Sequence, residues 1–177
     1  VGRLVAGLAK GFGMNVIAFD PFVDPDKIMA EGVTPVATID ELYEKSNFLS
    51  LHIPATSETK KSVGLTLMSK MPKGACLVNT ARKEVINEEE LAAVLEQRPD
   101  LKYVTDIAAD NQALLNEKFP GRVFATPKKM GAETANVEIF MLDISPRPSL
   151  LTDLTLKLYE VFGLSPVNEA VVIVVVT

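Results

Sequence analysis

The sequence predicts an α/β fold, a doubly wound parallel sheet, and three observations support this. Short apolar strands alternate with helices at the spacing of βαβ units. Polar residues follow the ends of the predicted strands, as at a ligand-binding sheet edge. The apolar run Ala75–Val78 gives way at once to the polar segment Asn79–Arg82, which is typical of a buried parallel strand that opens into a crevice. The 177 residues fit one domain, or one domain plus a fragment.

The predicted elements follow one another in a regular order. Strands are expected over residues 14–19, 34–36, 48–53, 75–78, 102–105, 123–125 and 171–176. Helices are expected over residues 3–10, 25–31, 39–45, 65–71, a segment that begins at 88, and 152–162.

Local signals define where these helices begin and end. Gly11 ends the first helix. Asp24 followed by Pro25 places a capping residue before a proline at the first helical position. Thr38-x-x-Glu41 has the pattern of a capping box, in which each side chain bonds to the other residue's backbone amide.

The composition argues against several classes of protein. A net charge of −5 without a cluster of lysines and arginines argues against nucleic acid as a partner. No signal peptide and no run long enough to span a bilayer is present, so no membrane partner is expected. The single cysteine, Cys76, indicates a reducing compartment, and we expect a cytoplasmic protein. His52 is the only histidine, so no metal site is expected. The chain opens on Val1 without a leader, as if cut from something longer.

Asp20 is the first candidate binding residue. It follows a predicted strand and lies 18 residues after Gly2, a separation at which an acidic residue can accept both hydroxyls of an adenosine ribose. The alternative is a turn aspartate before Pro21. No arginine follows that could hold a 2′-phosphate, which favours NAD over NADP. Only Val1-Gly2 could be the end of a glycine-rich phosphate motif.

Arg82 and His52 also follow or end predicted strands. The planar fork of donors on an arginine matches a carboxylate bidentately, so Arg82 is a candidate substrate ligand. The alternative is an ordinary surface ion pair. For His52, a core role or a supporting role is at least as plausible as catalysis.

Four segments together are similar to the NAD-binding domain of the D-2-hydroxyacid dehydrogenases. They are Leu51–Thr59, Asn79–Arg82, Asp106 and Thr126-Pro127. Within that family, the phosphoglycerate dehydrogenases are the most similar. The resemblance runs from Val1 to about Ile139. It implies a Rossmann domain over residues 1–139 that is incomplete at its N-terminus, followed by a segment of uncertain structure over residues 140–177, for which a remnant of a substrate domain is one interpretation.

The resemblance implies a role for each matching residue. Val1 and Gly2 would meet the pyrophosphate, and Asp20 the ribose. The cofactor-binding residues it implies are Val1, Gly2, Asp20, His52, Ile53, Pro54, Thr80, Ala81, Arg82, Asp106 and Gly131. Arg82 would also hold the carboxylate and carbonyl of the substrate.

Two positions depart from the family pattern. After Thr126-Pro127 the family usually has a catalytic histidine, where this chain has Lys128, and five residues after Asp106 it usually has a glutamate, where this chain has Asn111. A glutamate would raise the pKa of a lysine away from neutrality. The absence of both the histidine and the glutamate is therefore consistent with Lys128 as the acid/base and Asn111 as the residue that positions it. Asp110, next to Asn111, argues against this interpretation, since its carboxylate could supply the negative charge that the absent glutamate no longer provides.

The resemblance therefore implies an oxidoreductase that transfers a hydride between NAD and a D-2-hydroxy acid. D-3-phosphoglycerate, the substrate of the first step of serine synthesis, is the expected substrate, and a homodimer is the expected assembly. One alternative is a non-catalytic NAD-sensing or interaction protein on the same fold. Another is an inactive fragment.

The segment 171–176 is apolar on both faces, as only a central parallel strand should be. A doubly wound sheet has its first strand in the middle, and that strand should precede Gly2. We therefore expect residues 171–176 to fill the open position between the strands that end at Asp20 and His52, or to pair elsewhere on the sheet. The rival expectation is a poorly ordered tail or a remnant of the substrate domain.

Overall fold

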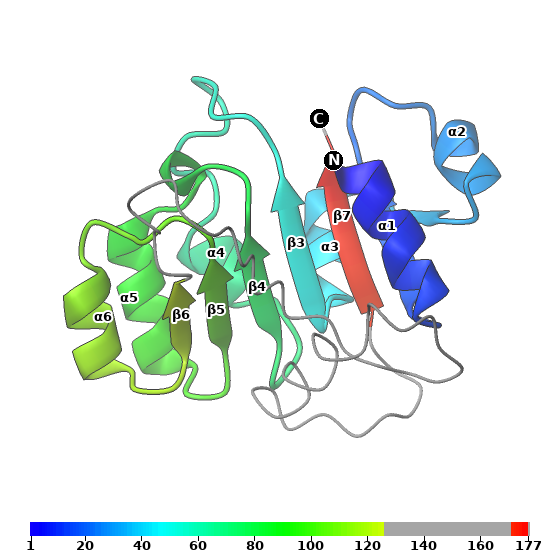
Figure 1. Cartoon of the computed structure of the whole chain (residues 1–177). Coiled ribbons are helices and arrows are strands. Elements are labelled where there is room, and N and C mark those ends of the chain that lie inside the picture. Colours follow the sequence, from blue (N-terminus) through cyan, green and yellow to red (C-terminus); the bar gives the residue numbers. More distant parts are fainter. Residues whose placement is uncertain (126–170, 177) are drawn as a thin grey trace, which may run out of the picture. The chain divides into compact units, whose positions relative to one another are not determined.

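A parallel sheet organises the computed structural model, which describes residues 1–125 and 171–176 (Figure 1). Within these residues the sheet has seven strands in the order β2-β1-β7-β3-β4-β5-β6, and every pairing is parallel. The strands are β1 (Asn15–Phe19), β2 (Thr34–Pro35), β3 (Phe48–His52), β4 (Cys76–Asn79), β5 (Lys102–Thr105), β6 (Val123–Ala125) and β7 (Val171–Val176). The predicted fold class is confirmed, because each of these strands agrees with a predicted one to within about a residue at either end.

Helices connect successive strands and cover both faces of the sheet. They are α1 (Gly2–Gly11), α2 (Pro25–Ala30), α3 (Ile39–Glu44), α4 (Leu65–Met68), α5 (Glu88–Gln97) and α6 (Gln112–Lys118), with a 3-10 turn η1 (Lys83–Val85). Figure 1 shows α1 in front of the sheet and α3 behind it. On that second face α3 contacts α4, and α4 contacts α5. This two-sided covering is the doubly wound arrangement.

Capping side chains explain where two of the helices begin. The Thr38 hydroxyl accepts a hydrogen bond from the Glu41 backbone amide at 3.1 Å. The Glu41 carboxylate reaches back to the Ala37 amide, at 3.0 Å, and not to the Thr38 amide that a capping box requires. Asn87 caps α5 by accepting from the Glu90 amide at 3.4 Å. The cap predicted at Thr38 is therefore confirmed, with the returning bond moved one residue earlier, and Asn87 stands directly before the helix expected to begin at residue 88.

Two features of the helices were not expected. The helix predicted over residues 65–71 ends at Met68, because the chain must turn before Pro72 and Gly74, where φ is +81°. The sequence interpretation also missed α6 and η1. Asn111, which precedes α6, is a residue type favoured at helix starts, although its side chain makes no capping bond.

Two buried clusters hold the described residues together. The larger one gathers big side chains around β3, β4 and β5, including Tyr43, Leu49, Leu77 and Leu91, each fully buried. The smaller one lies between α1, β1 and β2, and its members are mostly small. They are Ala6, Ala9, Val16, Ala18 and Val33. Small residues allow a helix to approach a strand closely, and α1 contacts both β1 and β7.

The strand β7 occupies the central position of the sheet. It pairs with β1 from Asn15↔Val171 to Phe19↔Val175, and with β3 from Phe48↔Val172 to His52↔Val176. This order matches a 3-2-1-4-5-6 sheet with β7 in the place of the first strand. The expectation that 171–176 fill the open position is confirmed, and the rival expectation of a tail outside the sheet is wrong for these residues.

Several predictions lie outside the described residues. These are the helix over 152–162, the domain boundary at 139, Thr126-Pro127, Lys128 and Gly131. Among the residues that are described, no helix combines the length and the apolar character needed to cross a membrane.

Candidate functional site

The carboxyl ends of the parallel strands bring the candidate residues to one edge of the sheet. His52 ends β3 and is in register with Val176 of β7, while Asn79 ends β4 and is in register with Leu51 and Thr105. Asp20 follows β1, and Asp106 follows β5. This is the edge at which doubly wound sheets bind their ligands. Polar residues at the ends of β1, β3, β4 and β5 therefore lie at the edge where the sequence predicted a crevice.

Asn79 fixes the turn that carries Arg82. Its side chain is 1% exposed, and its amide nitrogen donates to the Arg82 carbonyl at 3.0 Å. Its amide oxygen accepts from the Ala81 backbone amide at 3.1 Å. The same nitrogen lies 3.4 Å from the Tyr103 hydroxyl on the next strand. The sequence interpretation included Asn79 in the motif but missed this role, which the placement of a buried amide at the end of an apolar run could have indicated.

Arg82 stands exposed beyond this turn, at the start of η1. Among the described residues its guanidinium forms no ion pair, so a surface ion pair with any of them is not its role. Its backbone carbonyl is held by two donors, since it also accepts from the Val85 amide at 3.3 Å. A fixed backbone beneath an exposed fork of donors suits the binding of a small carboxylate.

Asp20 is half-buried and takes part in a turn. One of its carboxylate oxygens accepts a hydrogen bond from the Phe22 amide at 2.9 Å. The turn role that the sequence left open as an alternative is therefore real for this oxygen. It does not compete with ribose binding, because a carboxylate has two oxygens and about four acceptor positions.

His52 is neutral at pH 7. Burial is the main cause that lowers its pKa to about 4. Its Nε2 lies 3.0 Å from the Ser50 hydroxyl. A group with this pKa is not a proton donor at neutral pH, so the supporting role fits His52 better than catalysis.

The amino end of α1 is suited to an anion. The helix has ten residues, no acidic residue in its first turn and no side-chain cap at Val1. Gly2 is buried. Backbone amides at such a helix start, together with the helix dipole, favour negative charge. With Asp20 at the end of the next strand, these residues fit the pyrophosphate and ribose of a dinucleotide.

The loop after β5 contains an unsatisfied atom. The side-chain oxygen of Asn111 is buried and has no hydrogen-bond partner among the described residues. Nearby, the Asp110 carboxylate lies 2.5 Å from the Lys83 ammonium, and this contact raises the pKa of Lys83. The Asp110 charge is thus already partnered. Thr105, buried at the end of β5, bonds to the Ile107 backbone at 3.0 and 3.2 Å, and Asp106 is exposed.

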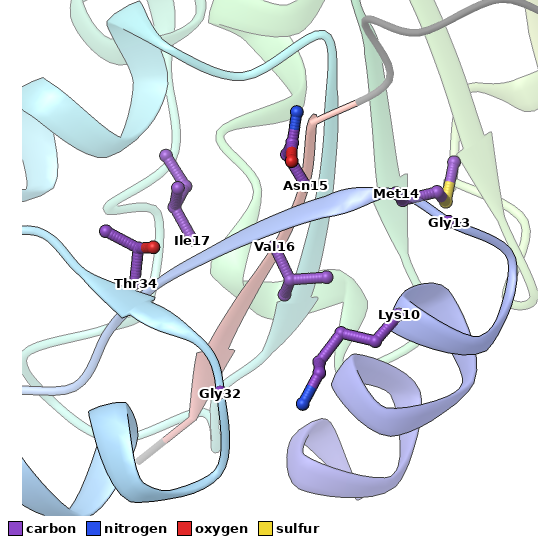
Figure 2. Close-up of a pocket in the computed structure, with 8 residues that line it drawn as sticks. All are labelled: Lys10, Gly13, Met14, Asn15, Val16, Ile17, Gly32 and Thr34. Carbon is purple, nitrogen blue, oxygen red and sulfur yellow. The ribbon is translucent and has the colours of Figure 1, made fainter.

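A separate pocket lies at the opposite edge of the sheet, at the amino ends of β1 and β2 (Figure 2). Its volume is about 410 Å³, and it is lined by residues 10, 13–17, 32 and 34. Figure 2 shows Lys10 extending from α1 toward Gly32, and its ammonium donates to the Glu31 carbonyl. This pocket is on the edge opposite to the carboxyl ends and contains none of the predicted site residues.

Comparison with known proteins identifies the domain. The sequence profile of "D-isomer specific 2-hydroxyacid dehydrogenase, NAD binding domain" matches residues 1–128. The cofactor of this domain family is NAD. A 3-phosphoglycerate dehydrogenase of Entamoeba histolytica, solved with NAD⁺ bound, is similar in structure with a TM-score of 0.54 and 37% sequence identity, over 75% of this chain and 52% of that one.

Curated relatives differ in the substrates that their names give. D-3-phosphoglycerate dehydrogenase 3 of Arabidopsis thaliana is 35% identical over 144 residues, which cover 78% of this chain and 24% of the relative. A glyoxylate reductase of Korarchaeum cryptofilum is 37% identical over 97 residues, which cover 55% of this chain and 29% of the relative. The chain therefore spans less than a third of the length of each of these two relatives.

Proposed function

Because this chain belongs to the D-isomer specific 2-hydroxyacid dehydrogenase family and matches its NAD-binding domain, we propose that it is the cofactor domain of an enzyme that oxidises a D-2-hydroxy acid. We propose D-3-phosphoglycerate as the preferred substrate. The observation that best supports the reaction class is the turn held by buried Asn79, which presents Arg82 at the carboxyl edge of the sheet.

Each part of the edge has a proposed role toward NAD. Val1 and Gly2 would hold the pyrophosphate, and Asp20 the adenosine ribose. Residues 52–54 would flank the adenine, and Thr80, Ala81, Asp106 and Gly131 would lie along the nicotinamide half. When bound, NAD supplies the hydride acceptor. The chain's own residues supply binding, orientation and a proton acceptor.

Arg82 would orient the substrate. Its guanidinium can donate two parallel hydrogen bonds to the carboxylate and also polarise the carbonyl as it forms. Holding the 2-hydroxyl carbon in one orientation gives much of the rate enhancement in such a reaction. The rigid Asn79 turn contributes to this, because the Arg82 backbone cannot shift without breaking its bonds to Asn79.

Lys128 is the proposed base that takes the hydroxyl proton. A lysine acts in this way only with a depressed pKa, so it needs surroundings without a free anion. The Asn111 side chain is neutral, and its buried oxygen, which has no partner among the described residues, could position the Lys128 amine by a hydrogen bond without adding a negative charge. Asp110, the complication raised by the sequence, is paired with Lys83 at 2.5 Å and 79% exposed, so its charge is screened.

The substrate proposal rests on similarity, and an assay can test it. Phosphoglycerate dehydrogenases and a glyoxylate reductase both match the chain. The longest form of the protein that contains this chain should reduce NAD⁺ with D-3-phosphoglycerate at a higher kcat/KM than with D-glycerate or glycolate. A higher kcat/KM with D-glycerate or glycolate would show that the proposed substrate is wrong, while the proposed reaction class would stand. NAD⁺ binding without reduction by any of them would favour a non-catalytic NAD-binding protein.

The remaining expectations concern the whole protein. We propose a homodimer in the cytoplasm, and a domain boundary near residue 139 that separates the NAD-binding domain from the following segment. Size-exclusion chromatography with light scattering would measure the assembly, and a tetramer or monomer would overturn it.

A further inference from the structure

We propose that Tyr103 is a positioning residue for the reaction: its buried hydroxyl joins the turn that carries Arg82 to the turn that follows β5. This rests on the proposed function, because Arg82 is the proposed ligand of the substrate carboxylate. The connection between the two turns can be tested without a substrate.

Three polar side chains meet on one face of the sheet, where β4 and β5 lie side by side (Figure 1). Asn79 of β4 is in register with Thr105 of β5, and Tyr103 lies two residues earlier on β5. Because side chains alternate between the two faces of a strand, Tyr103 and Thr105 point to the same face. All three side chains are at most 3% exposed. Their polar groups therefore need hydrogen-bond partners in the interior.

The hydrogen bonds of Asn79 have a fixed direction. Its Oδ1 accepts from the Ala81 amide at 3.1 Å, so its Nδ2 is the atom that faces the other partners. That nitrogen can only donate, and its two N–H groups go to the Arg82 carbonyl at 3.0 Å and to the Tyr103 hydroxyl at 3.4 Å. The Tyr103 oxygen is therefore an acceptor toward Asn79, and its own proton is left to donate to another group.

The Tyr103 hydroxyl forms its second hydrogen bond with the hydroxyl of Thr105. The Thr105 hydroxyl also accepts from the Ile107 amide at 3.2 Å and donates to the Ile107 carbonyl at 3.0 Å. A hydroxyl has one proton and two lone pairs, so the bond from Tyr103 uses the remaining lone pair of Thr105. The side chains of Asn79, Tyr103 and Thr105 thus form a continuous series of hydrogen bonds in which each of their N–H and O–H groups is used.

This series of hydrogen bonds links two turns whose relative position matters for hydride transfer. At one end it holds the Arg82 carbonyl, and at the other the backbone of Ile107. Ile107 directly follows Asp106, which is proposed to lie along the nicotinamide half of NAD. The substrate ligand and the cofactor contact are thereby fixed relative to each other through Tyr103. Because small misplacements of reacting groups cost rate, Tyr103 affects turnover through Arg82 without touching the substrate.

Tyr103→Phe in the longest form of the protein that contains this chain tests the proposal. The substitution removes one oxygen atom, so an N–H group of Asn79 loses its acceptor while the ring keeps its place in the core. With the 2-hydroxy acid that the protein oxidises best, kcat/KM should fall about tenfold, whereas the KM for NAD⁺ should stay within about twofold. Unchanged kcat/KM would overturn the proposal.

Tyr43→Phe is the matched control. Tyr43 is also buried, and its hydroxyl has no hydrogen-bond partner among the described residues. Loss of that oxygen breaks no bond to the Arg82 turn, so this variant should keep the kcat/KM of the unmodified protein. An equal fall in Tyr43→Phe and Tyr103→Phe would contradict a specific role for Tyr103.

A double-mutant cycle with Arg82→Ala separates a positioning role from a general structural defect. If Tyr103 acts through Arg82, its hydroxyl should matter little once the guanidinium is gone. Tyr103→Phe should then lower kcat/KM by less than about twofold in the Arg82→Ala background. A fall by the same factor in both backgrounds would overturn the proposal, because the defect would then be independent of Arg82.

Hydrogen exchange distinguishes failure of this proposal from failure of the proposed function. If the unmodified protein oxidises no 2-hydroxy acid, the proposed function fails. Tyr103→Phe should still speed the exchange of the Ala81 and Ile107 amides, and Tyr43→Phe should not. These two amides are bonded to the side chains at the ends of the hydrogen-bond series. Unchanged exchange of both amides in Tyr103→Phe would overturn the link between the two turns whatever the activity.

Discussion

The two parts of the sheet on either side of β7 are stabilised differently. On the β3–β6 side, large side chains such as Leu49 and Leu77 are fully buried in one continuous cluster. On the β1–β2 side the cluster is small and rich in alanine, while Leu4 and Phe22 are 75% and 79% exposed. Burial of large side chains is the main source of stability. The β3–β6 side therefore contributes most of the core, and the β1–β2 side depends more on its pairing with β7.

This difference matches the division of proposed roles. Arg82, which would hold the substrate, and Asn111, which would position Lys128, belong to the densely packed side, and precise chemistry requires rigid support. Val1, Gly2 and Asp20, which would hold the adenosine and pyrophosphate, belong to the lighter side. The comparison predicts that substitutions on the β3–β6 side impair stability and turnover, whereas substitutions on the β1–β2 side impair cofactor binding.

The largest effect on stability should come from the dense side. Leu49→Ala removes a fully buried side chain from β3 and should lower the free energy of unfolding by about 2–5 kcal/mol. Val16→Ala, its counterpart in the small cluster, should cost only about 1.5–2 kcal/mol, at about 0.8 kcal/mol per buried methylene-sized group. Urea denaturation of both variants measures this. Equal losses would contradict the comparison.

In the proposed chemistry, the largest effect should come from Lys128. Lys128→Ala should lower kcat by about 10²-fold or more, because general base catalysis contributes about that much. The unmodified enzyme should show a pH limb from a lysine with a depressed pKa, and the variant should lack it. If Lys128→Ala retains the full rate, Asp110 or a water molecule must act as the base.

Arg82→Ala should impair turnover and spare NAD⁺ binding. A charge-assisted hydrogen bond contributes roughly 1.5–3 kcal/mol, so kcat/KM should fall by about 10- to 150-fold. Arg82→Lys keeps the charge without the planar fork, and should recover only part of the loss. Near-normal kcat/KM in Arg82→Ala would refute the assignment of Arg82 as the substrate ligand.

His52 lies next to β7, where the two sides meet, and should make stability depend on pH. Its pKa is about 4 in the folded chain and 6.5 in the unfolded one, so the unfolded chain takes up the proton first as pH falls. The contribution of neutral His52 to the free energy of unfolding is therefore complete above pH 6.5 and is lost as the pH falls toward 4. Its size is roughly 2–3 kcal/mol. His52→Asn should show a smaller loss between pH 7 and pH 4.5 in denaturant titrations. An identical pH dependence in both proteins would contradict the assignment.

The sequence was sufficient to predict the sheet because its signals are local or strongly patterned. Alternation of strands and helices predicted the fold, and the apolar segment 171–176 predicted its own central position. Polar residues after each strand predicted which edge carries the site. The helix predicted through residue 71 was too long, because the sequence pattern does not reveal where the turn before Pro72 and Gly74 must begin.

What the sequence could not predict depends on contacts between distant residues. The ion pair of Lys83 with Asp110 joins residues 27 positions apart, and it changes the electrostatic argument for Asn111 and Lys128. The helix α6 is a different case, because Asn111 before it is a residue type favoured at helix starts and its start could have been predicted.

Calorimetric titration of this chain with NAD⁺ and NADP⁺ tests most directly whether the carboxyl edge is a dinucleotide site. We expect NAD⁺ to bind at least about tenfold more tightly than NADP⁺, because the Asp20 carboxylate would repel a 2′-phosphate and no arginine follows it. Asp20→Ala should weaken NAD⁺ binding and remove the discrimination. Equal binding of the two dinucleotides by the unmodified chain, or binding of neither, would contradict the account.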